Sequence, residues 1–175
     1  MSNDLRQEIV ALLPRLRRFA YSLAGNQDEA DDLVQAACER ALARLDQFAP
    51  GSRLDSWMFR IVQTVWIDRL RYGRRWRKVS DPVVMESIPH DARIHERTEA
   101  AHALALVRSA IAALPEEQRL VVALVAVEGM SYQEAADTLG VPVGTVMSRL
   151  ARARMKIGAA VADKPKVAKT KGAPT

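Results

Sequence analysis

Cysteine and histidine are scarce in this sequence of 175 residues, which has one cysteine and three histidines. The single cysteine, Cys38, excludes an internal disulfide, and the histidines lack the spacing of a zinc site. The longest apolar run, Leu120 to Val127, is far shorter than the roughly 20 residues that a membrane-spanning helix needs. The first ten residues carry acids where a secretory signal has a basic start. We therefore expect a cytoplasmic protein without a metal, a cofactor or membrane insertion.

Strand patterns and catalytic groupings are missing too. No segment alternates apolar and polar residues over a useful length, whereas apolar spacings of three and four residues recur throughout. This periodicity predicts an all-α fold. The sequence has no paired carboxylates, no Cys/His pair and no glycine-rich phosphate loop that would indicate catalysis. We accordingly expect no catalytic residues and no enzymatic activity.

Positive charge is in excess, with 26 basic against 21 acidic residues and a formal net charge of +5. This balance favours a polyanionic partner, and the distribution of the charge decides which kind. The stretch WIDRLRYGRRWRK, at 66–78, contains six basic residues, one acid and two of the three tryptophans. A surface that served only solubility would mix charge signs and leave tryptophan out. The stretch therefore points to nucleic acid.

Three helices are predicted in an N-terminal domain at 1–79. The first runs from Leu5 to Leu23 and ends at Gly25, the second opens at Asp28, and the third runs from Leu54 to about Tyr72. The second helix has one apolar stripe, formed by Ala30, Leu33, Val34, Ala37, Ala41, Leu42 and Leu45, and the third turns Met58, Ile61, Val62, Val65 and Trp66 toward a core. Residues 80–95, with two prolines and no periodicity, are predicted to be a flexible linker.

A second helical domain is predicted at 96–162, followed by a disordered basic tail at 163–175. Ser131 and Glu134 form a capping box that starts a short helix, and Gly140 ends it. A second helix follows from about Val143 to Ile157, which gives the pattern of a helix-turn-helix. Its inward stripe is Val146, Leu150, Ala153 and Ile157, and its opposite side carries Thr145, Ser148, Arg149, Arg152 and Lys156. Hydroxyls and guanidiniums on that side suit a DNA major groove, although an ordinary solvated face has the same composition.

A second polar stripe lies on the third helix and consists of Trp57, Arg60, Thr64, Arg71 and Arg75. An aromatic side chain among arginines offers unstacked bases a surface for stacking, with cations along the phosphates. The alternative is that Trp57 and Trp66 are core residues beside a solvated arginine face, and for Trp66 this alternative is favoured. Two nucleic-acid surfaces, one for duplex and one for separated strand, indicate promoter recognition with strand opening.

Three blocks carry a resemblance to a known family: DEADDLVQAACERALARLDQF, SWMFRIVQTVWIDRLR and EGMSYQEAADTLGVPVGTVMSRLARAR. Over about residues 5–160 the chain resembles the extracytoplasmic-function (ECF) sigma factors, two-domain bacterial transcription initiators. The resemblance implies an alternative sigma factor for a stress or environmental response, with core RNA polymerase, promoter DNA and an anti-sigma factor as partners. It implies that the clamp of the polymerase is bound through Asp31, Asp32 and Gln35.

The helix faces and the resemblance together predict the DNA contacts. The minus-ten element and its flipped base are expected at Phe48, Arg53, Trp57, Arg60, Thr64, Arg71, Arg74 and Arg75, and the minus-thirty-five element at Thr145, Ser148, Arg149 and Arg152. Two residues depart from the family pattern. Thr64 stands where an asparagine is usual, which loses an amide that both donates and accepts, and Met147 stands where relatives often carry a polar or basic residue.

Two other functions are alternatives for this sequence. A plain helix-turn-helix regulator would use the C-terminal domain alike, but it leaves the basic and aromatic cluster after Trp57 unexplained. A site-specific recombinase would need a catalytic serine among arginines on an α/β domain, for which the sequence has no strand pattern.

Overall fold

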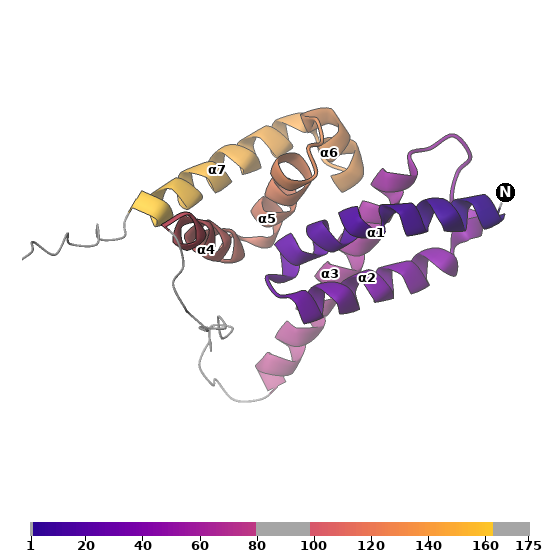
Figure 1. Ribbon diagram of the computed structural model, residues 1–175, viewed down its shortest axis with the longest axis horizontal. Helices are drawn as coiled ribbons and strands as arrows, with labels where there is room; N and C mark the ends of the chain where they lie inside the picture. The colour runs from indigo at the N-terminus through magenta and orange to yellow at the C-terminus, as the bar shows by residue number, and fades with distance from the viewer. Residues whose placement is uncertain (1, 80–98, 163–175) are drawn as a thin grey trace, which may run out of the picture.

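Every secondary-structure element in the described part of the chain is helical (Figure 1). The computed structural model describes residues 2–79 and 99–162. The elements are α1 (Ser2–Ala24), α2 (Gln27–Leu42), the 3-10 turn η1 (Leu45–Gln47), α3 (Leu54–Val79), α4 (Glu99–Ala112), α5 (Glu116–Val122), the π-helical turn η2 (Ala123–Val127), α6 (Tyr132–Leu139) and α7 (Val143–Ala162). The all-α prediction is confirmed. The predicted linker and tail lie outside the described residues.

The three N-terminal helices pack around a pair of phenylalanines. Gly25, at φ +85°, ends α1, and the Asn26 side chain caps α2 by accepting a hydrogen bond of 2.8 Å from the Glu29 N–H. Phe19 of α1 and Phe59 of α3 are fully buried and meet edge to face, with ring centroids 5.0 Å apart. All five α3 residues that were predicted to face this core are buried.

Two details of the N-terminal prediction were wrong. The third helix does not end near Tyr72, because α3 continues through Gly73 to Val79. A glycine inside a helix costs only about 0.5–1 kcal/mol relative to alanine, and the residues after it are good helix formers. Leu42, assigned to the buried stripe, is 47% exposed. It is the last residue of α2, where the facing side of α1 leaves a groove instead of a packed core.

The helix-turn-helix prediction is confirmed. The Ser131 hydroxyl accepts from the Glu134 N–H at 3.2 Å, and the Glu134 carboxylate accepts from the Ser131 N–H at 2.8 Å, so the capping box is complete. Gly140, at φ +66°, ends α6 in the left-handed conformation. The inward stripe of α7 is buried at Val146, Leu150 and Ala153. On the opposite side of α7, Ser148, Arg152 and Lys156 are exposed.

The C-terminal helices pack on the N-terminal ones, so that one buried cluster runs through both sets. Helix α1 touches α4, α5 and η2, and α3 touches α6 (Figure 1). Arg119 of α5 bridges the sets: its guanidinium donates to the carbonyls of Leu23 at 2.8 Å, Leu114 at 3.1 Å and Ala112, and lies 5.5 Å from the centre of the Trp66 ring. Burial lowers the pKa of Arg119, but a guanidinium stays charged near neutral pH.

Candidate functional site

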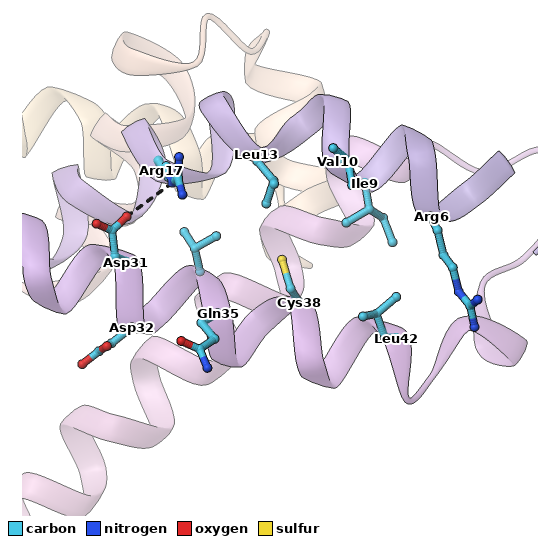
Figure 2. A pocket seen from close by; sticks show the side chains of 11 residues that line it. Arg6, Ile9, Val10, Leu13, Arg17, Asp31, Asp32, Gln35, Cys38 and Leu42 are labelled. Atoms are coloured by element: carbon cyan, nitrogen blue, oxygen red, sulfur yellow. Dashed lines mark ion pairs between the residues drawn. The ribbon is translucent and has the colours of Figure 1, made fainter. Parts of the chain in front are cut away.

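A groove of about 700 Å³ separates α1 from α2 (Figure 2). Its apolar wall includes two exposed side chains, Val10 at 62% and Leu42 at 47% exposure, together with Ile9, Leu13 and Val34. The thiol of Cys38 also lines it and is half-buried, and burial raises the pKa of this thiol. Exposed large apolar side chains beside a groove mark a binding surface. This wall was not predicted from the sequence, because the apolar spacing of the second helix placed Leu42 in the core.

The three predicted polymerase-binding residues line the same groove. Asp31 pairs with Arg17 of α1 at 3.3 Å across the groove, as Figure 2 shows. Gln35 donates to Glu39 at 3.0 Å, one turn further along α2. Asp32 is exposed, and its carboxylate has no ion-pair partner among the described residues. The surface therefore combines an apolar strip with acidic and amide groups at one side.

An aromatic pair lies at the start of α3. The Phe48 ring meets the Trp57 ring edge to face at 5.4 Å, and both side chains are half-buried. About two helical turns after Trp57, the exposed Thr64 hydroxyl donates to the Arg60 carbonyl at 2.8 Å. Trp66, in contrast, is buried in the core at 5% exposure, as the alternative interpretation of the tryptophans held. The structure thus brings Phe48, Trp57, Arg60 and Thr64 to one region.

The basic residues of the predicted minus-ten surface fall into two groups. Arg53 and Arg60 contact α6: Arg53 pairs with Glu134, and Arg60 donates to backbone carbonyls in the last turn of α6. Arg71 is exposed on α3. Arg74 and Arg75 belong to the last two turns of α3, where only the backbone is described. The predicted surface is therefore partly covered by the helix-turn-helix.

The predicted minus-thirty-five residues lie along α7 with different partners. Arg149 is only 19% exposed in its side chain and pairs with Glu117 of α5 at 2.8 Å. Arg152 is exposed and, within the described ranges, donates only inside α7, to the Ser148 carbonyl at 3.2 Å and to the Ser148 hydroxyl at 3.3 Å. Thr145 is half-buried in the first turn of the helix. Of the two arginines, Arg152 is the one whose guanidinium is available to a ligand.

In the described ranges, 2–79 and 99–162, no cluster of histidine, cysteine and acidic side chains could hold a metal ion. No helix there combines the length and the apolarity that crossing a membrane requires.

Comparison with known sequences gives a family for each half of the chain. The family model described as "Sigma-70, region 4" matches residues 104–157, and the one described as "Sigma2 domain of PhyR" matches residues 9–63. The chain is 41% identical over 164 residues to the ECF RNA polymerase sigma factor EcfG of Rhodopseudomonas palustris (strain TIE-1). That alignment covers 91% of this chain and 86% of the relative.

Two solved structures are similar over almost the whole chain. The sigma factor RpoE of Bartonella quintana, solved with the anti-sigma factor NepR, is 34% identical with a TM-score of 0.77, covering 93% of this chain and 99% of that one. CnrH, solved with the cytosolic domain of CnrY, is 29% identical with a TM-score of 0.68, covering 94% and 92%. Both similarities include the two helical halves.

Proposed function

Since the chain belongs to the ECF sigma factor family, we propose that it is an alternative sigma factor, which binds core RNA polymerase and directs it to specific promoters. The 41% identity to EcfG over 91% of the chain carries this proposal. The packed helix-turn-helix and the aromatic and basic face of α3 support it, because initiation needs one surface for duplex and one for separated strand. A plain regulator would have no use for the second surface.

The polymerase-binding surface that we propose is the groove between α1 and α2. Asp31, Asp32 and Gln35 supply its polar side, and Val10 and Leu42 supply an apolar side. An exposed apolar strip with a polar rim fits a protein partner. The chain has no proposed catalytic residue of its own, so the chemistry of transcription belongs to the polymerase. We place its site of action in the cytoplasm.

The promoter contacts that we propose divide between the halves. Phe48 and Trp57 give a stacking surface for bases of the minus-ten strand, Thr64 lies near them, and the arginines of α3 follow the phosphates. Thr145, Ser148, Arg149 and Arg152 read the minus-thirty-five duplex. The domain boundaries proposed with these roles are 1–79 for the first half and 96–162 for the second.

An anti-sigma factor is the regulatory partner that we propose. The similar sigma factor RpoE was solved with the anti-sigma factor NepR, and the similar protein CnrH was solved with the cytosolic domain of CnrY. Their chains align with nearly all of this one, so both helical halves are present for such a partner to bind. Co-purification of the native chain with a small protein that suppresses transcription would support this partner, whereas a native chain that is always purified alone and fully active would count against it.

Run-off transcription with purified core polymerase tests the proposed function. The reaction is run with and without this chain on a pool of bacterial promoter fragments, and the transcript starts are sequenced. We expect specific starts that depend on the chain, and aligned upstream sequences that define both promoter elements. Duplex binding without any chain-dependent start would favour the plain regulator instead.

Arg152→Ala is expected to weaken binding of the minus-thirty-five duplex by about 1–3 kcal/mol if the guanidinium pairs with a base. The reason is that Arg152 is exposed on the outer side of α7, where its guanidinium bonds to Ser148 of the same helix. Binding is measured by fluorescence anisotropy on promoter duplex and on scrambled duplex. Arg154→Ala, which removes the same charge from the same helix, is the control. An equal loss on both duplexes would identify a phosphate contact rather than base recognition.

A further inference from the structure

The arginine at the centre of the proposed minus-ten surface is bound to α6 in this structure. Arg60 donates from Nη2 to the Asp137 carbonyl at 2.6 Å and from Nε to the Thr138 carbonyl at 3.0 Å. These oxygens belong to the last turn of α6, where carbonyls lack helical partners and the helix dipole is negative. The α6 carbonyls therefore occupy guanidinium donors of Arg60 that could otherwise bind a DNA phosphate.

A chain of alternating charges extends this contact from α6 to α1. Glu134 pairs with Arg53, which pairs with Asp55 at 2.9 Å. Asp55 also accepts from Arg15 at 3.2 Å, and Arg15 pairs with Glu128 at 3.2 Å. Burial raises the pKa of Asp55, but hydrogen bonds from Arg53, from a backbone N–H and from Arg15 outweigh it and leave that pKa below its ordinary value. We name this series of ion pairs, together with the hydrogen bonds from Arg60 of α3 to α6, the interdomain latch.

Glu128 is the buried end of the latch. It follows the π-helical turn η2, and its side chain is 0% exposed, whereas Arg15 is 34% exposed. Arg18 lies 3.5 Å from the same carboxylate. Exposed ion pairs such as those of Arg53 are weak and easily screened, but a pair with a fully buried partner is screened much less. Glu128 is therefore the residue that holds the latch most firmly.

The latch does not involve the exposed residues on the outer side of α7. Ser148 and Arg152 are exposed, and among the described residues their side chains bond only within α7. Closing the two halves therefore covers one proposed DNA surface and spares the other. This asymmetry gives the latch a distinct experimental signature.

We propose that the interdomain latch is an autoinhibitory contact that masks the minus-ten surface of the free chain while leaving the minus-thirty-five surface accessible. The masking rests on the proposed function, because it concerns the DNA contacts assigned there. The minus-ten strand must displace Glu134 from Arg53 and the α6 carbonyls from Arg60. Its phosphates are the competing anions.

Separation of the two helical halves is measured first, by energy transfer between two dyes. In a full-length chain with Cys38→Ser, cysteines replace the exposed residues Ala43, after α2, and Met155, on α7, and carry the dyes. Glu128→Gln is expected to lower the transfer, since it removes the buried charge that Arg15 holds. Arg15→Gln breaks the same pair from the half-exposed side and is expected to act alike. Glu8→Gln removes an equal charge from an exposed position of α1 and is the control.

Strand binding is measured second, on unlabelled full-length variants. The probes are a single-stranded minus-ten oligonucleotide and a minus-thirty-five duplex, both taken from the promoters that run-off transcription identifies. Glu128→Gln is expected to raise affinity for the single strand by about fivefold, the size of one broken ion pair. Affinity for the duplex is expected to stay unchanged. Circular dichroism checks that each variant is folded.

The outcomes separate the latch from the proposed function. Lower transfer together with a gain on the single strand alone supports the latch. Unchanged energy transfer in folded Glu128→Gln and Arg15→Gln overturns the latch. So does lower transfer without a higher affinity for the single strand, or with an equal rise in affinity for the duplex. A chain that starts no transcript refutes the proposed function, and with it the masking role. The dyes would then still decide whether the contact holds the halves together.

Discussion

Phe59→Ala is expected to lower the free energy of unfolding by about 4 kcal/mol, because it leaves a cavity the size of a benzyl group in a closed core. Phe59 is 0% exposed, meets Phe19 edge to face at 5.0 Å and lies under the Arg15 guanidinium at 5.2 Å. The substitution therefore removes a ring pair and a cation-π contact as well as buried area. Urea unfolding followed by circular dichroism measures the loss.

Phe48→Ala is the matched control for this prediction. Phe48 also forms an edge-to-face ring pair, but its side chain is half-buried at the surface. Because water can fill the space that the ring leaves, its loss is expected to be less than half as large. Equal losses at the two positions would mean that the Phe19 and Phe59 pair is not the centre of the N-terminal core.

Arg119→Met is expected to lower the free energy of unfolding by about 3 kcal/mol, since partly buried carbonyls lose a charged donor. Arg119 donates to the carbonyls of Leu23 and Leu114, at the ends of two helices from different halves. Methionine keeps an apolar stem against Trp66, so the loss reports the hydrogen bonds rather than a cavity. The measurement is again urea unfolding.

Arg108→Met gives the comparison for Arg119. Arg108 also joins the halves by lying over an aromatic ring, 5.7 Å from the centre of Tyr21, but it is exposed. Its loss is expected to be about 0.5 kcal/mol, the value of an exposed cation-π contact. If Arg119→Met costs no more than Arg108→Met, the carbonyl bridge contributes nothing beyond ring stacking.

Local signals made the helix-turn-helix predictable. A capping box needs only Ser131 and Glu134 at the right spacing, and a left-handed helix end needs only Gly140, so four to ten neighbouring residues contain the information. The inward stripe of α7 follows in the same way from a period of 3.6 residues. The end of α3 was missed because Gly73 lowers helix propensity without preventing helix formation.

Contacts between distant residues could not be predicted from these patterns. Arg15 and Glu128 are 113 positions apart, and Arg60 and Thr138 are 78 apart. No local period relates such residues, so the sequence predicted Arg53 and Arg60 as DNA contacts without their partners on α6. Arg149 is similar: its position on α7 indicates DNA contact, but only the fold brings Glu117 beside it. The arginines could be predicted as DNA contacts from their residue type and position, but the acidic and carbonyl groups that bind them within the protein could not.

The position of Glu128 beside α1 depends more on the number of residues in the π-helical turn η2 than on which apolar residues form it. Its extra residue lets the Glu128 N–H bond to the Ala123 carbonyl, five positions back, at 3.0 Å. Deleting one residue from 123–127 would restore a regular helix and turn Glu128 by about 100° around its axis, away from α1. Sequences that diverge from this one can exchange apolar side chains here, but an insertion or deletion would break the contact between Glu128 and Arg15.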